Sequence, residues 1–241
     1  MNVELGRNRL RGILHLPSPT AAARFASGVL MVAGAGGGLQ GPSGIYTTLS
    51  RKLQKSGVLA LRLDYRRPNQ LSMCVDDVHD AIRELNTQYG VERVVLVGWS
   101  FGGAVVITAG AQSDKVIGVS TVASQTYGTD AVGDLAPRSL LLLHGTADTC
   151  LSANCSKQLY RRAKEPRKII LFEGDDHSLS RHYDKAESAI YDFSISLFNS
   201  WGREGEQQQQ EEAASATTSS SSGSTEKKRK HSLGGGNAGI I

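Results

Sequence analysis

A serine at a sharp turn is the first residue whose position could support chemistry. Ser100 lies in residues 98–103, Gly-Trp-Ser-Phe-Gly-Gly, directly after the apolar run 93–97 and before a helical pattern. Small residues two positions on either side of a serine let a strand and a helix approach closely, and the turn lifts the hydroxyl above the sheet. The helix N-terminus then stabilises developing negative charge. The spacing predicts a nucleophilic serine, although a glycine-rich turn without chemistry is an alternative for the motif alone.

An acid and a base follow the serine in a useful order. Asp148 comes after the apolar run 139–143, and His177 comes after 168–172, so each lies just beyond a predicted strand. An imidazole can take the serine proton, and a carboxylate can hold that imidazole in the required tautomer. Because ligands of parallel sheets bind at the carboxyl ends of strands, we predict that Ser100, Asp148 and His177 form a catalytic triad.

The other histidines and nearby acids are weaker candidates. Three histidines lie on a predicted strand, a predicted helix and the C-terminal segment: His15, His79 and His231. His144 ends a strand, and we expect its side chain to be buried near the turn. His182, five residues beyond His177, is the alternative base. We expect Asp175 and Asp176 to be solvated loop charges, because they are adjacent or nearly adjacent to His177 in sequence.

The elements that must position these residues alternate along the chain. Short runs rich in Val, Leu and Ile are predicted strands: 10–16, 28–33, 58–63, 93–97, 116–122, 139–144 and 167–172. Amphipathic or apolar segments are predicted helices: 43–55, 73–89, 101–111, 153–164 and 185–198. Continuous apolar strands are typical of parallel sheets that are buried on both faces. The alternation therefore predicts an α/β protein with a doubly wound, mostly parallel sheet.

The chain resembles the α/β-hydrolase superfamily, and within it the small dienelactone-hydrolase-like serine esterases. The resemblance covers residues 10–198 and rests on four segments: residues 98–103, His144-Gly145-x-x-Asp148, Asp176-His177 and Leu63-Asp64-Tyr65-Arg66. It implies an α/β-hydrolase fold, in which serine, aspartate and histidine occur in this order. Dienelactone hydrolases carry a cysteine where this chain has Ser100, so their specific substrate is not implied.

The glycine-rich loop after strand 28–33 has two interpretations. Residues 36–41 match the Gly-x-Gly-x-x-Gly pattern of a dinucleotide site, and Asp64 lies near where a ribose-binding acid would be. The hydrolase resemblance instead implies that the loop supplies an oxyanion hole, with the backbone N–H groups of Ala35 and Phe101 as donors. We favour the hydrolase interpretation, because a nucleotide-binding Rossmann-like site would leave the triad without a role.

The predicted activity is hydrolysis of a small carboxylic ester through an acyl-enzyme on Ser100, with no cofactor and no metal. Alternatives are a thioesterase or peptidase, and a hydrolase-fold binding module whose triad is silent. Only about 16 residues, 122–137, separate two strands where many lipases insert a helical cap. We therefore expect no large lid. Arg66 and Arg67 follow a strand end, where they would contact an anionic substrate or serve a structural role.

Composition divides the 241 residues into a catalytic domain, residues 1–201, and a low-complexity tail, residues 202–241. The tail contains glutamine, serine and glycine runs with five basic and five acidic residues. We expect it to be disordered, because it has few apolar residues to bury. The net charge of +4 therefore belongs to residues 1–201 and is too small to indicate nucleic-acid binding.

The expected location is the cytoplasm. Three cysteines are too few for a disulfide framework, and no apolar run is long enough to span a bilayer. The cluster Lys227-Lys228-Arg229-Lys230 matches a short nuclear localisation signal, although such clusters are more often solvated charge runs. The sequence indicates a small-molecule ester as the partner and gives no indication of the oligomeric state.

Overall fold

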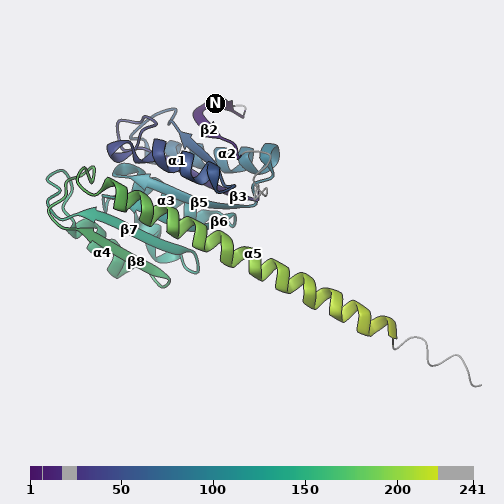
Figure 1. Ribbon diagram of the computed structural model, residues 1–241. Coiled ribbons are helices and arrows are strands. Elements are labelled where there is room, and N and C mark those ends of the chain that lie inside the picture. Colours follow the sequence, from purple (N-terminus) through teal and green to yellow (C-terminus); the bar gives the residue numbers. More distant parts are fainter. Residues whose placement is uncertain (7, 18–25, 222–241) are drawn as a thin grey trace, which may run out of the picture. The chain divides into compact units, whose positions relative to one another are not determined.

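The computed structural model describes residues 1–6, 8–17 and 26–221. Its eight strands form one sheet in the order β1-β2-β4-β3-β5-β6-β7-β8 (Figure 1). They are β1 (Asn2–Leu5), β2 (Leu10–His15), β3 (Ser27–Val32), β4 (Leu59–Leu63), β5 (Arg93–Trp99), β6 (Val116–Val122), β7 (Ser139–Gly145) and β8 (Arg167–Phe172). Strand β2 runs antiparallel to β1 and β4, and the other neighbours pair in parallel. This confirms the predicted doubly wound, mostly parallel sheet.

Helices cover both faces of the sheet. Helices α2 (Leu71–Tyr89), α3 (Phe101–Gln112) and α4 (Asn154–Arg162) pack on one face. Helix α1 (Ile45–Lys55) and the first part of α5 (Tyr183–Ser221) pack on the other (Figure 1). Every residue of β3 is buried, as expected for a central strand between two helical layers. The carboxyl ends of β3 to β8 consequently share one edge, which positions the loops that follow them.

Every predicted strand is present, with ends shifted by at most two residues. The sequence does not predict strand β1, because Asn-Val-Glu-Leu is polar and only its last residue is buried. Between β6 and β7 the chain forms the short 3-10 helix η2 (Asp130–Asp134) and no further domain. The described residues therefore place no large lid at this connection, as expected.

The chain divides into two compact units, Met1–Phe198 and Asn199–Ile241. Helix α5 continues to Ser221, past residue 201, where the sequence predicts the start of a disordered tail. Glutamate, glutamine and alanine, which dominate residues 204–214, have high helix propensity, and this accounts for the extension. Residues 222–241, with the basic cluster, lie outside the described residues. Of the helices in the described part of the chain, none has the length and apolar character needed to cross a membrane.

Candidate active site

Ser100 lies in a strained turn between β5 and α3. Its φ is 57° and its ψ is −119°, a region that residues with a Cβ rarely occupy. Two hydrogen bonds hold the turn: the Ser100 N–H donates to the Val122 carbonyl at 2.8 Å, and the Gly103 N–H donates to the Ser100 carbonyl at 3.0 Å. The side chain is half-buried at the edge where the parallel strands end.

The glycines around Ser100 leave no room for a Cβ atom. At Gly98, a Cβ would lie 2.2 Å from the Gly102 carbonyl oxygen. At Gly102 it would lie 2.3 Å from the Ala33 carbonyl oxygen, and at Gly103 it would lie 2.2 Å from Ser124 Oγ. Strand β5 and helix α3 therefore approach as closely as the Gly-x-Ser-x-Gly spacing requires.

Replacing Gly98 with alanine is expected to lower the free energy of unfolding by about 1–3 kcal/mol, because the overpacked contact is with backbone that cannot rotate away. Denaturant unfolding measures this change. Gly202→Ala is the matched control, since a Cβ at Gly202 meets nothing within 4 Å, and we expect a change below about 1 kcal/mol for it. Equal stability of Gly98→Ala and the parent protein would contradict the close approach.

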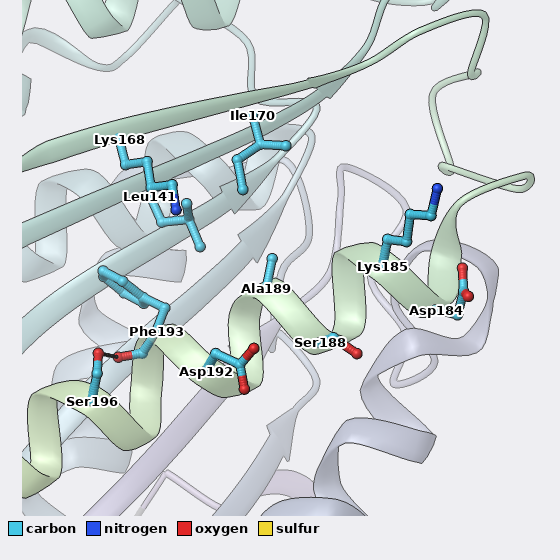
Figure 2. Close-up of a pocket in the computed structure, with 10 residues that line it drawn as sticks. All are labelled: Leu141, Lys168, Ile170, Asp184, Lys185, Ser188, Ala189, Asp192, Phe193 and Ser196. Carbon is cyan, nitrogen blue, oxygen red and sulfur yellow. Dashed lines mark hydrogen bonds between the residues drawn. The ribbon is translucent and has the colours of Figure 1, made fainter.

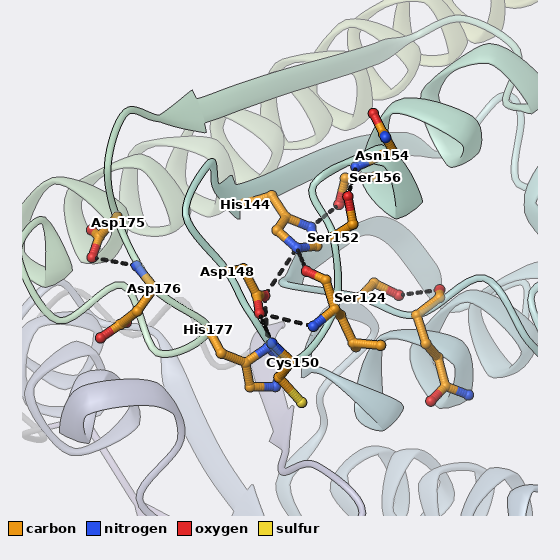
Figure 3. Close-up of polar contacts among 12 residues, drawn as sticks. Ser124, His144, Asp148, Cys150, Ser152, Asn154, Ser156, Asp175, Asp176 and His177 are labelled. Carbon is orange, nitrogen blue, oxygen red and sulfur yellow. Dashed lines mark hydrogen bonds and ion pairs between the residues drawn. The ribbon is translucent and has the colours of Figure 1, made fainter.

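The side chains of Asp148 and His177 are hydrogen-bonded to each other. Asp148 lies on the loop after β7 and His177 on the loop after β8, and His177 Nδ1 is 2.7 Å from Asp148 Oδ2. The backbone N–H groups of Cys150 and Leu151 donate to the other carboxylate oxygen, Oδ1, each at 2.8 Å. Figure 3 shows the carboxylate between the imidazole ring and the loop backbone.

The environment keeps Asp148 ionised. Its side chain is fully buried, and burial alone raises the pKa of the carboxyl group. The hydrogen bonds from Leu151, His177 and Cys150 outweigh that effect, so the pKa of Asp148 lies below its ordinary value. An ionised carboxylate that accepts a hydrogen bond from Nδ1 leaves Nε2 of His177 free to accept a proton.

Residue Trp99 connects the Ser100 turn to the His177 loop. Its indole Nε1–H donates to the His177 carbonyl at 3.1 Å, and the two rings lie 5.5 Å apart between centroids. Within the described residues, the Ser100 hydroxyl makes no hydrogen bond, so the structure pairs the acid with the base but does not join the base to the serine. Such hydrogen bonds are often long without a substrate and tighten when one binds.

The loop after β3 lies against the serine. A Cβ at Gly34 would be 3.3 Å from Ser100 Cβ and 3.8 Å from its Oγ. The backbone N–H groups of the next residue, Ala35, and of Phe101 donate no hydrogen bond to any described residue. These two predicted oxyanion donors are therefore free, on the two segments that flank Ser100.

Asp64 holds this loop in place. Its Oδ1 accepts the Gly38 N–H at 2.9 Å, and its Oδ2 lies 3.3 Å from Arg11 Nη2. In a dinucleotide site the corresponding acid would face a ribose, and the first glycine would follow the strand directly. Here β3 ends at Val32 and helix α1 begins only at Ile45. The contacts of Asp64 and the long segment between β3 and α1 both differ from those of a dinucleotide-binding turn.

The segment after Asp64 is also structural. The buried Tyr65 hydroxyl donates to the Ala33 carbonyl at 3.1 Å, which fixes the start of the glycine loop. The Arg66 guanidinium forms an ion pair with Asp77 of α2, whose side chain is fully buried. Both arginines considered for substrate contact are exposed. The Arg66 side chain is held by Asp77, whereas the Arg67 side chain forms no ion pair with the described residues.

Replacing Arg66 with alanine is expected to lower the free energy of unfolding by about 1–3 kcal/mol, because it leaves the buried Asp77 carboxylate without its cation. Thermal or denaturant unfolding measures the loss. The neighbouring exposed arginine supplies the control, and Arg67→Ala is expected to change stability by no more than about 0.5 kcal/mol. Similar stabilities for the two variants would show that the ion pair contributes little.

The remaining candidates have other partners. His182 Nδ1 is 2.9 Å from Asp175 Oδ2, so the alternative base pairs with a different carboxylate. The expectation that Asp175 is a solvated loop charge is wrong: its side chain is fully buried, and its oxygens accept the backbone N–H groups of Asp176, Arg181 and His182. Asp176 is exposed, as expected.

Two histidines lie away from the Ser100 turn, and a third is closer than expected. His15 contacts Arg62 and His79 contacts Gln112, whereas His231 lies outside the described residues. His144 is buried, as expected, but its Nε2 also lies 3.1 Å from Asp148 Oδ2 (Figure 3). The four-residue spacing between them in His-Gly-x-x-Asp was the available signal for this contact.

A hollow of about 730 Å³ lies on the α5 side of the sheet (Figure 2). Strands β7 and β8 and helix α5 line it through residues such as Leu141, Ile170 and Phe193. None of Ser100, Asp148 and His177 lines it. We therefore place the candidate site at the carboxyl edge of the strands, where the acid–base pair and the serine turn converge.

Known sequences similar to this chain identify its family. A family model described as the alpha/beta hydrolase family matches residues 29–149. The uncharacterized protein YfhR of Escherichia coli (strain K12) is 31% identical over 160 residues, which cover 55% of this chain and 56% of that protein. The chain thus spans about half the length of the curated relatives it matches.

Several solved structures share the fold. One is XC6422 from Xanthomonas campestris, a serine hydrolase without lid. The matched region covers 79% of this chain and 90% of XC6422, with a TM-score of 0.63 and 16% sequence identity. The match to the esterase domain of a Rhodothermus marinus protein covers 82% of this chain and 98% of that domain, with a TM-score of 0.66 and 20% sequence identity. The match to a dienelactone hydrolase from Anabaena variabilis covers 78% of this chain and 94% of that protein, with a TM-score of 0.65 and 17% sequence identity.

Proposed function

Because the chain belongs to the alpha/beta hydrolase family, we propose that it is a serine esterase that cleaves a small carboxylic ester. The observation that carries this proposal is the 2.7 Å hydrogen bond between His177 Nδ1 and Asp148 Oδ2, on loops that leave the same sheet edge as the strained Ser100 turn. An ionised acid, an oriented imidazole and a serine at a helix N-terminus are the parts that acyl transfer needs.

In the proposed mechanism, His177 Nε2 accepts the Ser100 proton as Oγ attacks the ester carbonyl. Asp148 stabilises the imidazolium that forms and keeps the proton on Nδ1. The N–H groups of Ala35 and Phe101 donate to the tetrahedral oxyanion. His177 then protonates the departing alkoxide, which leaves an acyl group on Ser100. The same imidazole then takes a proton from a water molecule whose oxygen attacks the acyl carbonyl. It returns that proton to Ser100 Oγ as the bond between the carbonyl carbon and Oγ breaks, which releases the acid and restores the serine.

Several features support small, soluble esters as substrates. The short β6–β7 connection adds no domain that could cover the strand edge. XC6422 is described as lacking a lid, and the Rhodothermus marinus domain is described as an esterase. An open site suits small acyl groups, because a long chain would stay exposed to water.

The free thiols of Cys74, Cys150 and Cys155 support a cytoplasmic location.

A fluorophosphonate probe tests the proposal with the full chain, because it reacts with activated serine nucleophiles. We expect labelling of the parent protein and loss of labelling in Ser100→Ala and His177→Ala. A panel of p-nitrophenyl acetate, an acyl thioester and an anilide then separates an esterase from a thioesterase or a peptidase. Folded protein that neither labels nor hydrolyses any of the three would overturn the proposal and favour a silent binding module.

A further inference from the structure

A second imidazole reaches the candidate catalytic acid from inside the fold. His144 is the sixth residue of β7 and is fully buried. Its Nε2 lies 3.1 Å from Asp148 Oδ2 and 2.9 Å from the Leu151 carbonyl. Its Nδ1 lies 2.7 Å from Ser156 Oγ, at the start of α4. The proposed triad mechanism assigns no role to this residue.

The partners fix the tautomer of His144. Nε2 faces two oxygens that can only accept, the Asp148 carboxylate and the Leu151 carbonyl, so Nε2 carries the proton. The Ser156 hydroxyl can then donate to the lone pair of Nδ1. Burial lowers the pKa of His144, which keeps the ring neutral. A neutral ring with this tautomer is therefore a hydrogen-bond donor to Asp148.

Each oxygen of the Asp148 carboxylate is consequently shared by two donors. Oδ1 accepts two backbone N–H groups, and Oδ2 accepts one imidazole N–H from His144 and one from His177. Four donors fill the acceptor sites of a carboxylate, so it cannot rotate without losing bonds. The His144 N–H also partly neutralises the negative charge on Oδ2, the oxygen that accepts the hydrogen bond from His177.

We propose that His144 is a positioning residue that holds the Asp148 carboxylate in one orientation. Because His144 shares Oδ2 with His177, it also weakens the hydrogen bond that His177 donates to that oxygen. This inference rests on the proposed esterase function, since its consequence for activity passes through His177. It assigns a role to the histidine of the His-Gly-x-x-Asp segment that a buried core residue would not have.

Other ionisable groups around Asp148 are already engaged or neutral. Among the described residues, the titratable side chains that face it are His144, His177 and Cys155. Burial raises the pKa of the Cys155 thiol, so it stays protonated near neutral pH. On the loop of His177, Asp175 and His182 pair with each other, and Asp176 is exposed and accepts hydrogen bonds from Ser178 and Ser180. Cys150 is exposed on the same loop as Asp148.

A pair of variants of equal length separates the hydrogen bond from packing. His144→Met fills the site without a donor, whereas His144→Gln places an amide N–H at the same distance from the backbone. In His144→Met, Oδ2 serves His177 alone and carries more negative charge. The imidazolium is then more stable, so the acid limb of the kcat/KM profile for p-nitrophenyl acetate should move up by about half a pH unit. His144→Gln should stay near the parent profile.

A second measurement does not depend on activity. In the full chain carrying Ser100→Ala, ¹H NMR observes the Nδ1–H proton that His177 shares with Asp148. We expect its resonance to move downfield in His144→Met, because the remaining hydrogen bond strengthens, and to return in His144→Gln. An unmoved resonance, or equal shifts for Met and Gln, would overturn the role of His144 even if the esterase proposal holds. If His144→Met does not fold, His144→Leu replaces it.

The two proposals fail in different ways. If the parent protein hydrolyses no ester while the Met and Gln variants show the expected difference in NMR, the esterase assignment is wrong and the role of His144 stands. If ester hydrolysis depends on Ser100 but the pH profiles of all three proteins coincide, the esterase assignment stands and His144 is only a core residue.

Discussion

Replacing Ser100 with alanine is expected to lower kcat for p-nitrophenyl acetate by at least about 10⁴-fold, because no acyl-enzyme can form without Oγ. The remaining rate would come from the oxyanion donors and from binding, which do not need the serine. Stopped or continuous absorbance assays of the released p-nitrophenol measure the loss. The substitution removes one half-buried hydroxyl that bonds to no described residue, so we expect stability to change by no more than about 0.5 kcal/mol.

A serine on another element provides the control for that experiment. Ser188 lies on α5 and lines the hollow on the opposite side of the sheet from α3. Ser188→Ala should retain the parent kcat. If Ser100→Ala kept even a tenth of the parent activity in purified, folded protein, Ser100 would not be the nucleophile, and the proposed mechanism would have to be abandoned.

Asp148→Asn is expected to reduce kcat by about 10⁴-fold through the tautomer of the base rather than through the loss of a reacting group. An amide nitrogen at Oδ2 would place two N–H donors against the imidazole N–H groups of His144 and His177. His177 would respond by moving its proton from Nδ1 to Nε2, where it can no longer accept the serine proton. Steady-state kinetics at saturating ester measure the effect.

The matched control is a carboxylate that the site does not use. Asp192 is exposed on α5, and Asp192→Asn should leave kcat unchanged. Because the four donors around Asp148 cannot all be satisfied by an amide, Asp148→Asn should also unfold at lower denaturant concentration than Asp192→Asn. Full activity in Asp148→Asn would instead mean that His177 needs no anionic partner.

Local pattern was sufficient to predict most of the fold. The central strands are continuous apolar runs, because helices cover both faces of the sheet, and such runs are visible in sequence. The turn at Ser100 was predictable for a related reason, since only glycine fits where Gly98 and Gly102 meet neighbouring backbone. Strand β1 was not predictable, because an edge strand that buries only Leu5 has almost no apolar signal.

Contacts that depend on loop geometry could not be predicted. Asp175 is two residues from His177, and a flexible loop would leave it solvated. In the structure the chain wraps around it so that backbone N–H groups from three later residues converge on its carboxylate. The pairing of Arg66 with Asp77 depends on how α2 packs beside the end of β4. Neither arrangement leaves a periodic or spacing signal.

The contacts of His144 extend from α4 to the strand edge, through Ser156, His144, Asp148 and His177 in turn. Each residue in this series restricts which side chains the next position tolerates. An apolar residue at 156 leaves Nδ1 of His144 unpaired in the core, and an apolar residue at 144 leaves the Ser156 hydroxyl without its acceptor. We therefore expect substitutions at Ser156 and His144 to occur together in proteins that evolve from this sequence.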